Sequence, residues 1–341
     1  MSTAVRDASG VEAVLAVIRA VEILSPTAVR FGGERLERAP ATAAEAAQAE
    51  SGGILIPLLT EALYGRAYAR RLGWPAPALT QPGPDDDLVP ALSAANPGRE
   101  RWEAGWQVRQ ALSTGRVIAE RNGGARFLWP GEFIASDAPG TPPRPGARVT
   151  VWRPRESATL QPGFYFVFGE AGGDDDAALL RVYWNVSPDG APALTATVAA
   201  TMNRWGMPFR YKCLSRRSLY PRTDSAVLYV ARRGWRLVRE LVMEVQAAAA
   251  PHLHPDPPLF ARPLARGMSM AEDPGTGDSF GMSRCRMLAE GVWTAWRTGH
   301  RGTRERLDAV RQAFARGGVS LDEPWKAAAS PVRYDEEGAD A

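Results

Sequence analysis

Lysine is nearly absent from this chain, so the few lysines it keeps are candidates for chemistry that arginine cannot perform. Among 41 basic residues only Lys212 and Lys326 are lysines, and Lys212 lies in an apolar, strand-like run over residues 208–214. A lysine amine that is desolvated beside other cations loses its proton more readily and can act as a base, whereas arginine stays protonated. Lys212 is therefore a candidate general base. The simpler alternative is a surface lysine whose stem lies along the protein.

The residues before Lys212 predict a strand-helix-strand unit. A β-rich run over residues 179–186 is followed by Ser187-Pro188-Asp189, which is typical of a helix start. The helix ends near Gly206, before the second strand. A crossover of this length returns parallel to the first strand in the same sheet. The apolar stripe of the helix comprises Ala191, Leu194, Val198, Met202 and Trp205.

Alternation along the two strands assigns their polar residues to one face of the sheet. Arg181, Tyr183 and Asn185 point the same way on the first strand, away from its apolar residues. Arg210 and Lys212 share a face on the second strand. If the helix covers the apolar face, the polar residues of both strands emerge together opposite it. Clustered cations are costly to bury without a counter-ion, so the sequence predicts a phosphate or carboxylate site here.

Two later segments can add to this site. Arg222 precedes another strand, over residues 226–230, and Asp224 is placed to orient its guanidinium. Farther on, Asp278 or Ser279 caps a predicted helix that carries Arg284 one turn in. Free backbone N–H groups at a helix start, together with an arginine, form an anion site. The alternative is an ordinary capped helix with a surface arginine.

The overall pattern predicts an α+β fold with a mainly helical N-terminal region followed by a mixed sheet that contains the strand-helix-strand unit. A proline-rich stretch over 138–146 suggests a linker. The predicted units are residues 1–144, residues 145–330 and a flexible tail over 331–341. The expected N-terminal elements are helices over 11–24, 41–50, 53–72 and 99–113, and a hairpin over 116–133.

Composition excludes several classes of function. A net charge of +3 without a basic tract does not imply nucleic-acid binding. Neither a signal-peptide pattern nor a long apolar run is present, so we expect a cytoplasmic protein that does not enter membranes. Cys213 and Cys285 suggest buried, reduced thiols. A Walker-type loop is missing and histidines are few, so we expect no cofactor and no metal.

Four ordered blocks of the sequence resemble the HopA-type effector domain, over about residues 145–300. These blocks are Arg181-Val182-Tyr183-Trp184-Asn185-Val186, Pro208-Phe209-Arg210-Tyr211-Lys212, residues 222–229 and residues 279–291. Stand-alone proteins with this domain partner an aminoglycoside-phosphotransferase-like kinase in class V lanthipeptide and thioamitide dehydration. The resemblance implies a phosphoserine and phosphothreonine lyase. It also implies a kinase subunit, a precursor peptide and a cyclase as partners.

The strand-helix-strand unit is also similar to the lyase domains of class III lanthipeptide synthetases and to phosphothreonine lyase effectors. Their first strand carries Lys-x-His and their second a catalytic Lys after Phe, whereas this chain has Arg181-Val182-Tyr183 and Arg210 there. Either Lys212 has taken over as the base or the register is shifted by one pleat. Tyr183, in the place of the acid histidine, becomes the candidate acid.

The resemblance therefore implies a set of roles. Lys212 is the base and Tyr183 the acid, and Asn185, Asp224 and Ser279 support them. The phosphate-binding residues are Arg181, Arg210, Arg222 and Arg284. A non-catalytic module that binds a phosphorylated or acidic segment through the same arginines is the alternative, and Lys212→Ala separates the two.

Overall fold

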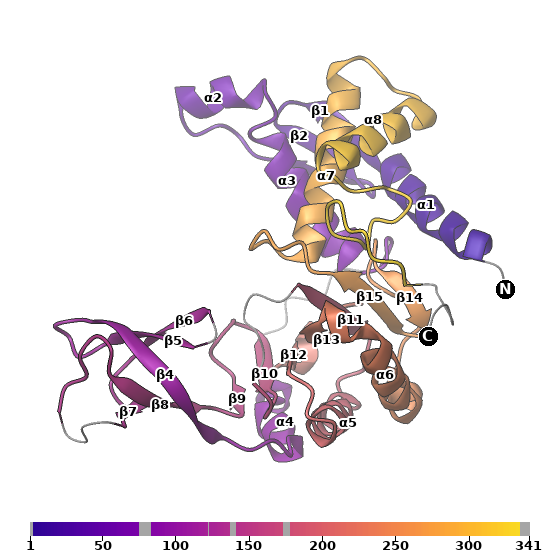
Figure 1. Cartoon of the computed structure of the whole chain (residues 1–341). Helices are drawn as coiled ribbons and strands as arrows, with labels where there is room; N and C mark the ends of the chain where they lie inside the picture. The colour runs from indigo at the N-terminus through magenta and orange to yellow at the C-terminus, as the bar shows by residue number, and fades with distance from the viewer. Residues whose placement is uncertain (1–2, 75–82, 122, 137–140, 173–177, 335–341) are drawn as a thin grey trace.

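The computed structural model describes residues 3–74, 83–121, 123–136, 141–172 and 178–334. It contains both helices and antiparallel sheets, which confirms the predicted α+β class (Figure 1). Residues 138–140 of the predicted linker and residues 335–341 of the predicted tail lie outside the described residues.

A seven-stranded sheet forms the centre of the molecule, in the order β14-β15-β11-β13-β12-β10-β9. All neighbouring strands pair antiparallel. Because β13 pairs with both β11 and β12, those two strands are parallel to each other, as predicted, with β13 inserted between them. The strands are β9 (Glu156–Ser157), β10 (Phe164–Phe168), β11 (Leu179–Trp184), β12 (Phe209–Leu214), β13 (Ala226–Ala231), β14 (Arg262–Ala265) and β15 (Met268–Glu272).

One face of this sheet is covered by α5 (Ala191–Arg204) and α6 (Trp235–Ala249) (Figure 1). The predicted stripe of α5 is buried from Ala191 to Met202. Trp205 is 55% exposed, so the prediction that it belongs to the buried stripe was wrong. The helix also starts later than predicted. Ser187 does not cap it; its Oγ accepts from the N–H of Gly190 in a turn that precedes the helix.

The opposite face meets elements from both ends of the chain. α7 (Phe280–Arg297) begins at this face and packs against α3 (Leu55–Leu63) and a π-helical turn, η1 (Tyr64–Tyr68). Gly281 allows this approach: a Cβ there would lie 2.3 Å from the ring of Tyr68, so any side chain would clash. α8 (Thr303–Arg316) then packs on α1 (Thr3–Ala20), so the first and the last of the described helices lie side by side (Figure 1).

The helix predicted over residues 99–113 is wrong, because its residues form a strand with alternating side chains. That segment is β4 (Arg101–Ala111), the central strand of a five-stranded sheet in which Trp106 and Val108 are buried on one face. The predicted hairpin is confirmed as β5 (Val117–Arg121) and β6 (Gly124–Leu128). The sheet is completed by β7 (Phe133–Ala135) and β8 (Arg148–Arg153), so its strands come from both sides of the predicted boundary near residue 145.

The N-terminal region is less helical than predicted. The helix expected over residues 11–24 ends at Ala20, and the chain turns into a three-stranded sheet. Its β-branched residues Val21, Ile23 and Val29 face the core, which favours strands. The remaining elements are β1 (Val21–Ser25), β2 (Ala28–Phe31), β3 (Glu34–Glu37), α2 (Ala43–Ala49), α4 (Val89–Ala95) and short helical turns at Pro84–Asp86, Arg217–Leu219, Arg232–Gly234 and Ala250–His252.

Candidate functional site

The sheet face opposite α5 and α6 carries the predicted cluster in two cross-strand rows. In the first, Tyr229 of β13 stands between Arg181 of β11 and Arg210 of β12. In the second, Val227 stands between Tyr183 and Lys212. Because residues directly opposite one another across a sheet point to the same face, these side chains emerge together. The predicted sharing of one face by both strands is confirmed.

Lys212 is half-buried at the edge of this face. Its Nζ donates to Oε1 of Gln161 at 3.0 Å and lies 4.2 Å from the centroid of the Phe164 ring. The pKa of Lys212 is lowered to about 8, mainly by burial and also by the charges of Arg181, Arg210 and Arg222, while the charge of Asp224 opposes this shift. The amine is therefore largely free in weakly alkaline solution, as a general base requires.

Tyr229 is the platform of the cluster. The guanidinium carbons of Arg181 and Arg210 lie 5.3 and 4.7 Å from its ring centroid, and Nζ of Lys212 lies 5.9 Å from it. Such cation–π contacts hold cations close together. Arg181 also forms an ion pair with Asp273 at 2.6 Å. Arg210 is exposed and has no ion pair among the described residues, which leaves its donors available to an anion.

Arg222 approaches the same face from the segment before β13. Its Nε and Nη2 donate to the two carboxylate oxygens of Asp224 at 2.8 and 2.9 Å, so Asp224 orients it as predicted. Nη2 also donates to the hydroxyl of Tyr64 at 3.1 Å. Burial and then Asp224 raise the pKa of Tyr64 to about 12, so its hydroxyl stays protonated and can donate. Nearby, Nε of Arg70 donates to the carbonyl of Pro221.

Tyr183 lies deeper than the other members of the cluster. Its side chain is 2% exposed, and its ring packs against that of Phe280 at 6.3 Å. Its hydroxyl has no hydrogen-bond partner among the described residues. Burial is the main cause that raises the pKa of Tyr183 above its usual value. The hydroxyl keeps its proton, but α7 covers it.

Three of the predicted residues lie away from the open face. Arg284 is 1% exposed and donates to the carbonyls of Pro324 and Lys326 at 2.7 and 2.6 Å, so it anchors the C-terminal segment. The amide of Asn185 donates to the carbonyl of Asp256. Ser279 caps α7 by accepting from the N–H of Met282, which settles the alternative between Asp278 and Ser279.

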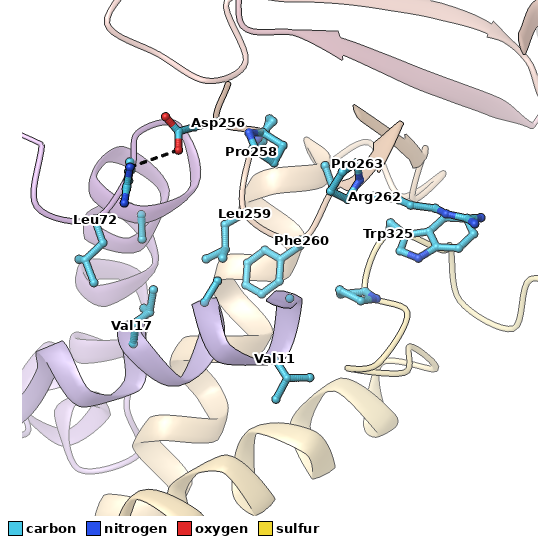
Figure 2. A pocket seen from close by; sticks show the side chains of 18 of the residues that line it. Val11, Val17, Leu72, Asp256, Pro258, Leu259, Phe260, Arg262, Pro263 and Trp325 are labelled. Atoms are coloured by element: carbon cyan, nitrogen blue, oxygen red, sulfur yellow. Dashed lines mark ion pairs between the residues drawn. The ribbon is translucent and has the colours of Figure 1, made fainter. Parts of the chain in front are cut away.

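A cavity of about 910 Å³ lies beside the cluster, between α1, the segment after η1, residues 256–263 and residues 321–325 (Figure 2). Its wall includes Val17, Leu259 and Phe260, and the ion pair of Arg71 with Asp256 at 3.5 Å closes one side (Figure 2). Arg70 lines the cavity and is close enough to Arg222 for that charge, after burial, to lower its pKa. The cavity and the arginine cluster are thus neighbours.

Sequence reasoning missed three side chains at this site. Gln161 lies in the turn before β10, Tyr64 in η1, and Tyr229 in β13, inside a block used for the resemblance. Only Tyr229 carried a usable signal, because its strand alternates and the register puts it between two arginines. Gln161 and Tyr64 reach the site through tertiary contacts that no local pattern encodes.

Both cysteines are buried and unpaired among the described residues, as predicted. Within the same residues, no three histidine, cysteine, aspartate or glutamate side chains gather as ligands for a metal ion. None of the helices described combines the length and the apolar character that crossing a membrane would require.

Comparison with known proteins gives one family. A model described as the HopA1 effector protein family matches residues 155–326, about half of the chain. No curated protein matches.

Two solved structures are similar to part of the chain. An effector protein from Pseudomonas syringae pv. tomato strain DC3000 is 21% identical, with a TM-score of 0.40, over 49% of this chain and 65% of its own. One from Pseudomonas syringae pv. syringae strain 61 is 17% identical, with a TM-score of 0.38, over 48% and 63%. The chain thus spans a little under two thirds of these proteins.

Proposed function

This chain belongs to the HopA1 effector protein family, and from that premise we propose that it is a metal-independent lyase that eliminates phosphate from phosphoserine and phosphothreonine residues of a peptide. The observation that carries the proposal is Lys212: a half-buried amine of lowered pKa on the same sheet face as Arg181 and Arg210, and close enough to Arg222 to be affected by its charge. A base beside several guanidinium groups matches what this elimination needs.

The elimination is balanced without a cofactor. Lys212 takes the α-proton of the phosphorylated residue, and the electron pair of that C–H bond becomes the Cα–Cβ double bond. The Cβ–O bond breaks and its electron pair leaves with the phosphate. The products are a dehydroamino acid residue, a protonated lysine and inorganic phosphate. A general base of this kind typically contributes about 10²–10⁴-fold to the rate.

The arginines supply charge compensation. Guanidinium groups bind phosphate oxygens in a fixed, bidentate geometry, and charge-assisted hydrogen bonds strengthen as negative charge develops on the leaving group. Arg210 is the arginine with donors most open to such an anion, and Arg222 is oriented for it by Asp224. The resemblance implies Tyr183 as the acid, but Tyr183 is buried, so in this proposal Tyr64, which is bonded to Arg222 and only half-buried, takes that role.

The phosphate must be installed by another protein. In this proposal an aminoglycoside-phosphotransferase-like kinase phosphorylates a precursor peptide, and this chain converts the product to dehydroalanine or dehydrobutyrine during cytoplasmic lanthipeptide biosynthesis. A cyclase would act afterwards. Phosphoryl-group removal by elimination rather than hydrolysis leaves an electrophilic double bond, which suits the later addition of a thiol.

The second candidate is a phosphopeptide-binding module without catalysis. The ion pairs of Arg181 with Asp273 and of Arg222 with Asp224 favour it, because paired arginines in a fixed cluster also suit recognition alone.

Mass spectrometry of a phosphothreonine peptide incubated with the protein, without nucleotide or metal, tests the proposal. A lyase removes the mass of phosphoric acid from each site, and Lys212→Ala stops the loss while the peptide still binds. Lys326→Arg is the matched control and should keep full activity. Binding by the wild-type protein without elimination, in the presence of the kinase, would select the binding module instead.

A further inference from the structure

Lys212 has one direct hydrogen-bond partner in the described part of the chain, and that partner is uncharged. Oε1 of Gln161 accepts from Nζ at 3.0 Å. The nearest charged groups that act on the amine are Asp224 and the arginines 181, 210 and 222. Asp224 is bound on both oxygens by Arg222, so its charge is already partly compensated. The acceptor that touches the lysine therefore adds no net charge beside it.

The turn that carries Gln161 is fixed by its own bonds. The carbonyl of Gln161 accepts from the N–H of Phe164, and the carbonyl of Gly163 accepts from the N–H of Ser215 at the end of β12. Gly163 has a φ of +82°, which only glycine adopts without strain. The turn is thus bonded to the residue that follows β12, the strand of Lys212, and leads directly into β10.

Resting on the proposed function, we propose that Gln161 is a positioning residue for Lys212, which holds the amine over the open face of the sheet and leaves its lone pair free for the substrate. A neutral amine has two N–H donors and one lone pair. One N–H bonded to Gln161 fixes the direction of the nitrogen, and the Phe164 ring covers another side. A carboxylate in the place of Gln161 would instead stabilise the ammonium form, which is not a base.

The electrostatics explain why an amide suits this position. A cation over an aromatic ring is stabilised, so Phe164 and Tyr229 favour the protonated amine. Burial and the three arginines favour the neutral amine, and their combined effect is larger, so the pKa of Lys212 falls below its usual value. A full negative charge at hydrogen-bond distance would favour the protonated form much more strongly than an amide dipole does.

Titration of Lys212 by NMR tests the inference without any substrate. With only two lysines in the chain, Lys326→Arg leaves a single labelled lysine amine to follow. In that background, Gln161→Glu should raise the pKa of Lys212 from about 8 to about 9, as expected for an opposite charge in contact. At pH 8 the free amine then falls about fivefold. Gln312→Glu, on the exposed face of α8, is the matched control and should leave the titration unchanged.

Kinetics supply the second readout. Gln161→Glu should shift the acidic limb of the pH profile of kcat/KM to higher pH, by the same amount as the pKa of Lys212. Gln161→Leu should lower kcat, while the position of that limb and the affinity for the phosphopeptide stay the same. If Gln161→Glu leaves the titration where Gln312→Glu leaves it, the inference is overturned. If the titration moves but the wild-type protein eliminates no phosphate, the lyase proposal fails and the contact between Gln161 and Lys212 stands.

Discussion

The guanidinium of Arg222 binds both carboxylate oxygens of Asp224, two residues later, and its Nη2 also donates to the hydroxyl of Tyr64. The carboxylate of this ion pair partly offsets the positive charge of the cluster. Asp224 is the carboxylate that raises the pKa of Lys212 against burial and three arginines. It also fixes the guanidinium that we propose for phosphate binding.

Asp224→Asn should lower the pKa of Lys212 below about 8. The substitution removes a negative charge and leaves Arg222 uncompensated, and both changes disfavour the ammonium form. NMR titration of the lysine amine measures the effect. Asp273→Asn is the matched control: it removes the partner of Arg181 and should shift the pKa of Lys212 less. A pKa that rises in Asp224→Asn would contradict this account.

The elimination rate should rise with pH through about 8, the pKa of Lys212, because the base acts only when deprotonated. The same group affects stability. Its folded pKa lies below the usual value of 10.5, so the unfolded chain binds more protons and the free energy of unfolding rises with pH between these values. Comparing wild type with Lys212→Met by denaturant unfolding at pH 7 and pH 10 measures this term. A difference that does not vary with pH would rule it out.

Arg210→Ala should weaken binding of a phosphopeptide roughly 10- to 150-fold, because one charge-assisted hydrogen bond contributes roughly 1.5–3 kcal/mol. Its side chain is exposed and forms no ion pair within the described residues, so thermal stability should stay the same. Isothermal titration at two salt concentrations gives the affinity and its salt dependence. Arg236→Ala, on the exposed side of α6, is the control that removes the same charge from the opposite face of the sheet.

Arg284→Met should destabilise the fold rather than weaken phosphate binding. The guanidinium is buried, burial lowers its pKa to about 10, and it donates to the carbonyls of Pro324 and Lys326. Each buried carbonyl left without a donor costs roughly 1–3 kcal/mol. Denaturant unfolding and phosphopeptide titration on the same variant separate the two effects. Unchanged stability with lost affinity would restore Arg284 to the phosphate site that the sequence predicted.

Two tyrosine variants decide which hydroxyl takes part in the elimination. Tyr64→Phe removes the half-buried hydroxyl that accepts from Arg222, and should reduce kcat about 10²-fold if it donates a proton to the phosphate. Tyr183→Phe removes a hydroxyl that is covered by α7 and unbonded within the described residues, and should leave kcat close to wild type. The reverse result would support Tyr183 as the acid that the resemblance implies.

The sequence predicted which side chains of β11 and β12 share a face, because alternation along these strands is regular. Arg181 and Lys212 were assigned to one face from period-two patterns alone, and the cross-strand register agrees. The insertion of β13 between their strands was not predicted, because no local pattern specifies strand order. Arg284 was assigned to an anion site because it follows a helix start. Its burial depends instead on residues 324–326, about forty positions away.

The N-terminal region shows the opposite case. The segment around Trp106 contains apolar residues at spacings that suit either a helix or a strand, and its partner strand β8 decided the outcome. Tyr64 lies 158 positions from Arg222, so their contact depends on how η1 packs against the segment before β13, where Thr223 bonds the carbonyl of Tyr68. Helical periodicity identified that segment as a helix and could not show which of its side chains meets the cluster.

The place of β13 in the sheet also bears on how the cluster comes into being as the chain folds. β11 and β12 precede it in sequence, yet they do not pair with each other, and each of them pairs with β13. Such non-local pairing is slow because long loops must close first. Asp224 and Arg222 directly precede β13. The carboxylate that tempers the mutual repulsion of the cations thus reaches the sheet in the same folding step as the strand that brings those cations together.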